Sequence, residues 1–147
     1  MSLKIRISNL NKKRGIDRKA LKKTALRILR DFGKNEALID ITVVGNRKIK
    51  VLNEKYMGRG VPTDVLSFLL EEGAIRPKGR RLIGDIYISS DTAAQNARRF
   101  KTSPRKELHR YVIHGILHLV GFGDKTVKEK NRIRKLEEKF LKWRSRD

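Results

Sequence analysis

Two histidines stand four residues apart in the apolar stretch HGILHLVGFGD, at residues 114–124. On an α-helix this spacing puts both imidazoles on one face, one turn apart, so that both can reach a single ion. Gly121 follows, and a glycine can adopt the positive φ that ends a helix and turns the chain back. Asp124 then comes within reach of the same ion. The stretch therefore predicts a metal site made by His114, His118 and Asp124.

The alternative is that both histidines are ordinary helix residues, each hydrogen-bonded to a neighbour. Leu117, Leu119 and Val120 indicate instead a segment that faces the core, where unpaired imidazoles would cost free energy. The pattern H-x-x-x-H-x-x-G-x-x-D also matches the ligand spacing of metzincins. Two imidazoles and one carboxylate leave a position of the ion open, which is typical of a catalytic site. His109, five residues before His114, falls on another face and is expected at the surface or in contact with phosphate.

Gly115 occupies the position where zinc peptidases carry their catalytic glutamate, directly after the first histidine. A small metallopeptidase would therefore need a general base from elsewhere. A glycine inside a helix costs about 1 kcal/mol relative to alanine. Its presence suggests that bulk is excluded here, and we expect that this lets a substrate approach the ion.

The charge of the chain indicates a polyanionic partner. Lys and Arg number 37 against 16 acidic residues, a formal net charge of +21 over 147 residues. RNA, DNA and an anionic membrane surface would all suit this excess. However, the N-terminal MSLKIRISNL alternates, unlike a signal peptide, and no apolar run approaches the roughly 20 residues that span a bilayer. The lack of cysteine excludes thiolate metal sites and fits a reducing cytoplasm. We expect a nucleic-acid partner, no membrane and a cytoplasmic location.

The periodicity of apolar residues predicts the elements that carry these residues. We expect strands at 3–8, 37–45, 63–70 and 82–89, and helices at 16–33, 46–58, 90–100, 103–121 and about 127–143. Asp17, Asn46 and Ser103 are the expected N-caps of the first, second and fourth helices, with Pro104 at the first helical position. Residues 71–81, EEGAIRPKGRR, are expected to form a turn or a mobile loop.

The resulting order of elements is β-α-β-α-β-β-α-α-α, which is an α+β pattern. The chain carries no internal repeat and no low-complexity linker. We therefore expect a single domain over 1–147, with a small four-stranded mixed sheet, about five helices around it and the histidine helix at the centre.

Three segments together resemble one known family. HGILHLVGFGD resembles the signature H-G-x-L-H-L-x-G-Y-D-H of the YbeY-type bacterial rRNA maturation factors, which are metal-dependent endoribonucleases. LNEKYMGRGVPTDVLSF at 52–68 is similar to that family's N-x-x-Y-R-x-x-x-x-P-T-[DN]-V-L-S-F. GDIYIS at 84–89 resembles its G-D-I-x-I strand. The matches cover most of the chain between 52 and 124, in the family's order.

The resemblance implies hydrolysis of single-stranded RNA, in maturation of the 3′ end of small-subunit ribosomal RNA and in ribosome quality control. Its implied partners are ribosomal RNA and the small ribosomal subunit. Its implied cofactor is one zinc ion, with nickel, manganese and iron as alternatives. It also puts Thr63, Asp64 and Ser67 at the border of the cleft, although a structural role is the simpler interpretation of all three.

The chain departs from the family pattern at two positions. The family's third ligand is usually a histidine preceded by aspartate, whereas Gly123 and Asp124 stand here, which gives a harder site. Met57 stands where the family has an arginine, and Arg59 is the candidate to supply the missing guanidinium. Two other functions stay open: a metallopeptidase, and a non-catalytic RNA-binding ribosome-assembly protein whose metal is structural.

Overall fold

Strands and helices alternate in the first half of the chain, and three helices close it. The computed structural model describes residues 2–76 and 79–145. Its strands are β1 (Leu3–Asn9), β2 (Ala37–Val44), β3 (Val65–Arg76) and β4 (Gly79–Ser89), and its helices are α1 (Arg18–Asp31), α2 (Asn46–Met57), α3 (Ser90–Phe100), α4 (Pro104–Leu119) and α5 (Val127–Ser145). The predicted α+β fold is confirmed.

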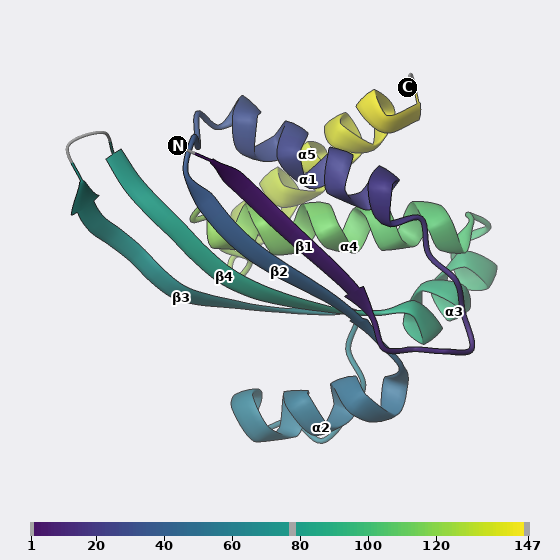
Figure 1. The fold of residues 1–147 in the computed structure, drawn as a ribbon. Helices are drawn as coiled ribbons and strands as arrows, with labels where there is room; N and C mark the ends of the chain where they lie inside the picture. The colour runs from purple at the N-terminus through teal and green to yellow at the C-terminus, as the bar shows by residue number, and fades with distance from the viewer. Residues whose placement is uncertain (1, 77–78, 146–147) are drawn as a thin grey trace.

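The four strands form one mixed sheet in the order β1-β2-β4-β3 (Figure 1). β1, β2 and β4 are parallel, and β3 runs antiparallel to β4. The carboxyl ends of the parallel strands meet at one edge of the sheet, where α2 follows β2 and α3 follows β4. This edge gathers polar side chains from segments far apart in the sequence.

One face of the sheet packs against a layer of helices with α4 at its centre. α4 contacts β3 and β4 and is flanked by α1, α3 and α5. Alternate strand residues point into this layer and are buried, among them Ile39, Ile41, Ile86 and Ile88. The predicted central position of the histidine helix is therefore confirmed. Because α4 is held on nearly every side, its side chains have little freedom to move.

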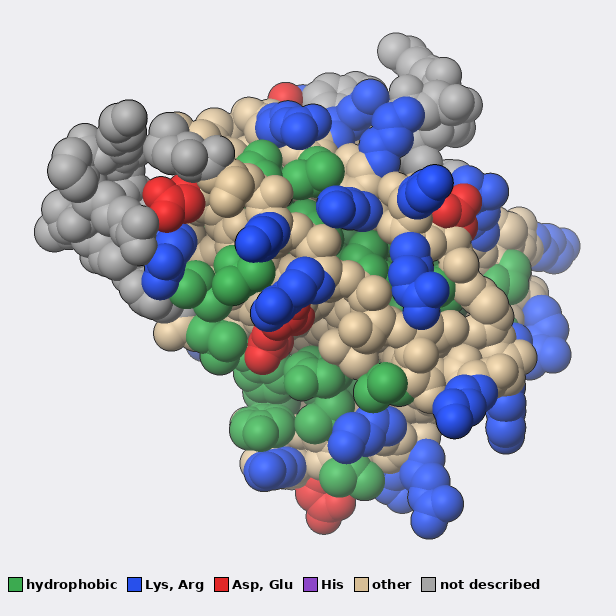
Figure 2. Space-filling view, in the orientation of Figure 1, with side chains coloured by type: hydrophobic (Ala, Val, Ile, Leu, Met, Phe, Trp, Pro, Cys, Tyr) green, Lys and Arg blue, Asp and Glu red, His purple; other side chains and the backbone are tan. Residues whose placement is uncertain are grey.

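Among the described helices, α2 alone packs on the opposite face of the sheet, at one end (Figure 1). Val44, Ile49, Leu52 and Leu66 form a small separate cluster under it. Elsewhere this face stays open, and Figure 2 shows hydrophobic side chains on it among scattered Lys and Arg side chains. Within the described part of the chain, no helix combines the length and the apolar character needed to cross a membrane.

The helix starts agree with the sequence in most cases. Asp17 accepts a hydrogen bond from the amide of Ala20, and Ser103 accepts one from the amide of Lys106. Asn46 is different, because the N-cap of α2 is Gly45 and Asn46 is the first helical residue. The predicted capping role of Asn46 is therefore wrong. Its amide is satisfied by a longer-range bond, described next.

A group of polar residues at the carboxyl ends of the parallel strands, here called the strand-end network, consists of Asn11, Asn46, Ser89, Asp91 and Thr92. Asp91 accepts bonds from the Asn46 amide at 2.9 Å and from Asn11 Nδ2 at 3.0 Å. Ser89 and Thr92 both donate to Asn46 Oδ1, at 2.7 and 2.8 Å. The network ties the chain after β1 to the starts of α2 and α3.

The interpretation of 71–81 as a turn or mobile loop is wrong for most of that segment. Residues 71–76 continue β3, and residues 79–81 belong to β4. The strands pair from Glu71 opposite Ile83 to Arg76 opposite Gly79, with two irregularities of register. Pairing with β4 supplies the backbone hydrogen bonds, which outweighs the weak local preference of this sequence for a strand. Residues 77–78 lie outside the described residues.

Candidate metal centre

The helix α4 presents His114 and His118 side by side at the edge of the core. Its other positions are mostly buried, including Val112, Ile113 and Ile116. The two histidine side chains keep 25% and 26% of their surface exposed, so both rings reach solvent from a fixed backbone. As the sequence predicts, the spacing of four residues places the two imidazoles next to each other on one face of α4.

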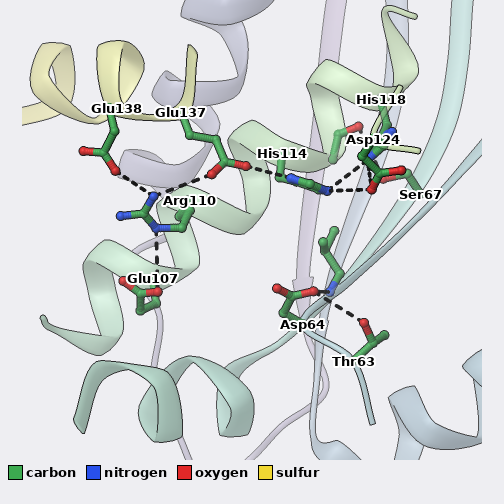
Figure 3. Close-up of polar contacts among 12 residues, drawn as sticks. Thr63, Asp64, Ser67, Glu107, Arg110, His114, His118, Asp124, Glu137 and Glu138 are labelled. Atoms are coloured by element: carbon green, nitrogen blue, oxygen red, sulfur yellow. Dashed lines mark hydrogen bonds and ion pairs between the residues drawn. The ribbon is translucent and has the colours of Figure 1, made fainter. Parts of the chain in front are cut away.

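A tight turn after α4 brings the third residue back to the histidines. Gly121 has a φ of 111°, which a side chain would strain. The amide of Gly121 donates to the His118 carbonyl, and the amide of Phe122 donates to the Leu117 carbonyl, at 3.1 and 3.0 Å. These bonds satisfy the last carbonyls of the helix and reverse the chain. Asp124 then lies beside both imidazoles (Figure 3).

The three ligand atoms converge closely enough to hold one ion. His114 Nε2 and His118 Nε2 are 2.9 Å apart. Asp124 Oδ2 lies 3.2 Å from His118 Nε2 and 3.9 Å from His114 Nε2. In a tetrahedral zinc site the ligand atoms lie roughly 3.3 Å from one another, which falls within this range. The donor set, two imidazoles and a carboxylate, therefore fits a divalent metal ion in both chemistry and spacing.

Glu137 of α5, which no motif in the sequence indicates, orients His114. Its Oε2 lies 2.7 Å from His114 Nδ1. A carboxylate only accepts, so Nδ1 donates, and the Nε2 of the neutral ring keeps its lone pair for the metal. The signal in the sequence is a carboxylate within an apolar stripe, since Glu137 is buried between Ile133 and Leu141 on α5. Only the packing of α5 on α4 shows what this carboxylate contacts.

Arg110 holds Glu137 and links it to two more carboxylates (Figure 3). Its guanidinium lies 2.8 Å from Glu138 Oε1, 3.5 Å from Glu137 Oε1 and 3.7 Å from Glu107 Oε1. Burial lowers the pKa of Arg110, but the three glutamates outweigh it and raise that pKa overall. The network thus extends from the first turn of α4 through α5 to the candidate metal ligands.

The two histidines differ in their affinity for protons. Burial lowers the pKa of His114, but the Glu137 hydrogen bond and charge reverse this and raise the pKa. Burial and the neighbouring charge of His114 lower the pKa of His118 more than Asp124 raises it. A neutral His118 is therefore favoured near neutral pH, which a metal ligand requires.

A cleft of about 470 Å³ opens in front of the three ligands. Thr63, Asp64 and Ser67 line it, together with Met57 and Leu69. Asp64 accepts from the Val65 amide at 2.8 Å, and Ser67 donates to the Gly115 carbonyl at 3.3 Å. Each of these polar side chains thus has a structural bond and also borders the site.

Arg59 lies on the exposed loop after α2, where its amide donates to the Asn53 carbonyl at 3.3 Å. Met57, two residues earlier, lines the cleft, whereas Arg59 is not among the described residues that do. The structure therefore brings His114, His118 and Asp124 together and leaves the Arg59 side chain outside the cleft wall. Its role stays a prediction.

Two interpretations made from the sequence are corrected by packing. His109 is buried with 1% of its surface exposed, and its Nδ1 lies 2.8 Å from Thr24 Oγ1, so it is neither a surface nor a phosphate-contacting residue. Other elements surround α4, so more than one of its faces is buried, including the face that carries His109. Gly115 is also buried, and a Cβ there would lie 2.8 Å from Ile86 Cγ2. A larger side chain is excluded at Gly115 because α4 lies close to β4. The glycine is therefore not explained by the approach of a substrate to the ion.

The chain is similar to a well-populated group of proteins. A family model described as endoribonuclease YbeY matches residues 6–144. The Endoribonuclease YbeY of Syntrophus aciditrophicus is 37% identical, over 83% of this chain and 76% of that protein. Those of Aquifex aeolicus and Bacillus subtilis are 34% and 36% identical, over 88% and 77% of this chain and 85% and 72% of their own lengths.

A solved structure agrees with this relationship. The solution structure of a Thermotoga maritima protein superposes with a TM-score of 0.62 at 32% sequence identity, covering 97% of this chain and 93% of that one. The family predicted from three short motifs is thus confirmed over nearly the whole sequence. In sequence and in fold, the chain belongs to the YbeY family of endoribonucleases.

Proposed function

We propose that this protein is a metal-dependent endoribonuclease that cleaves single-stranded RNA. Membership of the family supports the activity and the substrate class. The observation that carries the proposal is the convergence of His114, His118 and Asp124 on a cleft open to solvent. A purely structural metal would not need an open side. We further propose that the RNA is ribosomal, with cleavage at the 3′ end of the small-subunit RNA and a role in ribosome quality control, and that the location is cytoplasmic.

His114, His118 and Asp124 are the proposed ligands of one metal ion. Zinc is the proposed ion because imidazole and carboxylate suit it, with nickel, manganese and iron as alternatives for the same donors. When bound, such an ion polarises a phosphoryl oxygen and lowers the pKa of a bound water toward neutrality. In the neutral His114 ring, the 2.7 Å contact with Glu137 holds the proton on Nδ1 and leaves the Nε2 lone pair to the metal.

Residues of the cleft wall and of the basic surface are proposed to bind and orient the RNA. Thr63 and Ser67 offer hydroxyl groups along the cleft wall. Asp64 is held by the Val65 amide, so we assign it mainly to the shape of the cleft. We propose that Arg59, on the exposed loop beside Met57, stabilises negative charge on the phosphate. The net charge of +21 supports binding to the RNA backbone that weakens as salt increases.

The test compares two substrates and two proteins. Metal-loaded protein is incubated with ribosomal RNA fragments and with casein, with and without chelator, beside a His118→Ala variant whose fold is checked by circular dichroism. We expect RNA cleavage that chelator and His118→Ala both abolish, with casein intact. Cleavage of casein alone would support a metallopeptidase, and RNA binding without cleavage of either substrate would support an assembly factor with a structural metal.

The identity of the ion is tested on the purified protein. Elemental analysis of wild type and of Asp124→His compares the harder ligand set of this chain with the set usual in the family. We expect zinc in both proteins, with tighter retention of the ion in Asp124→His. An ion such as calcium or magnesium, bound equally by both proteins, would contradict the proposed imidazole site.

A further inference from the structure

A second cleft, of about 300 Å³, lies on the other side of the metal ligands. It shares Asp64, His114 and Asp124 with the first cleft and continues between α4 and α5. Its added lining includes Arg110, Lys130, Arg134 and Glu137. The metal ligands thus stand at the junction of two clefts, which together form a path across the site.

The basic side chains of this second cleft differ in whether they pair with acidic side chains. Arg110 is engaged by three glutamates, and Glu137 is bound by both Arg110 and His114. Lys130 and Arg134 lie one turn apart on α5 and are exposed, and neither has an ion pair with an acidic side chain of the described residues. In the part of the chain that the structure describes, Lys130 and Arg134 therefore line the cleft without an acidic partner.

Among the described residues, the acidic groups that line the second cleft form no ion pair with Lys130 or Arg134. Asp64 is hydrogen-bonded to the Val65 amide, and Asp124 belongs to the proposed ligand set. The first cleft is different, since its added lining is neutral and includes Met57, Leu69 and Leu119 besides two hydroxyl residues. One arm of the path therefore suits a charged backbone, and the other suits bases and sugars.

We infer that Lys130 and Arg134 bind the RNA phosphate next to the one that is cut. A strand that crosses the metal centre must continue into both clefts, and this pair supplies the charge to hold a neighbouring phosphate in the second. The two residues then fix the register of the strand and the direction in which it enters. This inference rests on the proposed ribonuclease function and names positioning residues for it.

The first experiment compares K130Q/R134Q with K128Q/K135Q. Both variants lose two positive charges from exposed positions of α5, but Lys128 and Lys135 do not line the cleft. With a short single-stranded RNA, we expect K130Q/R134Q to raise KM by roughly tenfold or more with kcat within about threefold of wild type. The slope of log affinity against log salt should decrease by about 0.7 for each lost phosphate contact. The control should change KM by less than about threefold.

The second experiment identifies the phosphate. A neutral methylphosphonate linkage is moved one position at a time along the RNA, and its effect on KM is measured in wild type and in K130Q/R134Q. We expect one position adjacent to the cut where neutralisation weakens wild type about tenfold and leaves the variant nearly unchanged. Additive losses at every position, or equal losses in K130Q/R134Q and K128Q/K135Q, would overturn the inference.

The outcomes separate this inference from the function on which it rests. If wild-type protein with its metal fails to cleave RNA, the proposed function is wrong and the positioning role fails with it. If wild type cleaves and K130Q/R134Q cleaves with an unchanged KM, only the positioning role is wrong. Circular dichroism and thermal unfolding of both double variants show whether α5 stays folded.

Discussion

The strand-end network and the candidate metal centre differ in how many of their polar atoms remain free to bind a ligand. In the strand-end network, the Asp91 carboxylate accepts from Asn11, Arg14 and Asn46, so both oxygens are committed within the protein. In the candidate metal centre, the two histidines are the only described side chains that pair with the Asp124 carboxylate, which keeps 47% of its side-chain surface exposed. A closed network holds segments together, whereas an open one presents atoms to a ligand.

The difference follows from where each network lies in the fold. The strand-end network lies where three parallel strands deliver chain ends to one place, so its residues satisfy backbone amides at helix starts. The metal centre lies at the end of α4, where a turn at Gly121 returns the chain over the helix it has just left. Replacing the carboxylate in each network tests the contrast directly.

Asp124→Ala should give the largest change in activity and a small one in stability. Loss of one of three ligands should reduce RNA cleavage by about a thousandfold or more, which corresponds to roughly 4 kcal/mol of activation free energy. The free energy of unfolding of the metal-free protein should change by less than about 1 kcal/mol, because the carboxylate is half exposed. Cleavage assays and urea unfolding measure both. Unfolding of the variant at room temperature would contradict the open character of this centre.

Asp91→Ala should show the reverse. It removes the acceptor of the Asn46 amide and of the Arg14 side chain, and one of the two acceptors of Asn11 Nδ2, which should cost about 2–3 kcal/mol of unfolding free energy. Cleavage per folded molecule should stay within about twofold of wild type. Asp31→Ala, at an exposed position, is the matched control and should unfold like wild type. If Asp91→Ala lost activity while remaining stable, the strand-end network would not be merely structural.

Glu137→Gln tests the only described carboxylate that hydrogen-bonds His114 from α5. An amide still fits the space but supports the Nδ1 proton of His114 less strongly. Metal affinity should decrease about 10- to 100-fold, measured by competition with a chromogenic chelator. Glu138→Gln is the control, because Glu138 contacts Arg110 but not His114. Equal losses in both variants would show that the whole charge network matters and not the direct bond.

The smallest expected effect is a change with pH in the stability that Asp91 contributes to the strand-end network. Burial raises the pKa of Asp91. Hydrogen bonds from the Asn46 amide and from the Arg14 and Asn11 side chains together lower it by more, so the pKa of Asp91 is lowered overall. A lowered pKa in the folded state gives stability that is present above the unfolded value, about 3.9, and is lost as pH falls through the folded value. The difference in unfolding free energy between wild type and Asp91→Asn, about 1 kcal/mol at neutral pH, should therefore narrow in acid. A constant difference between pH 7 and pH 3 would contradict this origin.

The sequence predicts local features of this protein well because they depend on short spacings. The order of elements, the caps Asp17 and Ser103 and the pair His114 and His118 all follow from residues within one or two helical turns. The turn that returns Asp124 is equally local. Family motifs add the activity, because three of them occur in the expected order.

Features that depend on distant contacts were missed or misread. Glu137 lies 23 residues from His114, and only the packing of α5 on α4 joins them. His109 was expected at the surface because helical periodicity assumes one buried face, whereas α4 is enclosed on several. The long hairpin of β3 and β4 is stable through pairing between strands, which local composition does not report. The role of Arg59 in stabilising phosphate charge stays a prediction.

The turn at Gly121 has a consequence for how the protein would exchange its ion. Both imidazoles are carried by a helix whose backbone is held by the hydrophobic core, so the positions from which they extend should change little without global unfolding. The third donor is carried by a short return segment, residues 121–125, in which no residue is fully buried. Ion release should therefore be governed by brief opening of that segment, and its rate should be insensitive to treatments that merely rigidify the core. Heat, by contrast, should destroy the site and the fold in one transition.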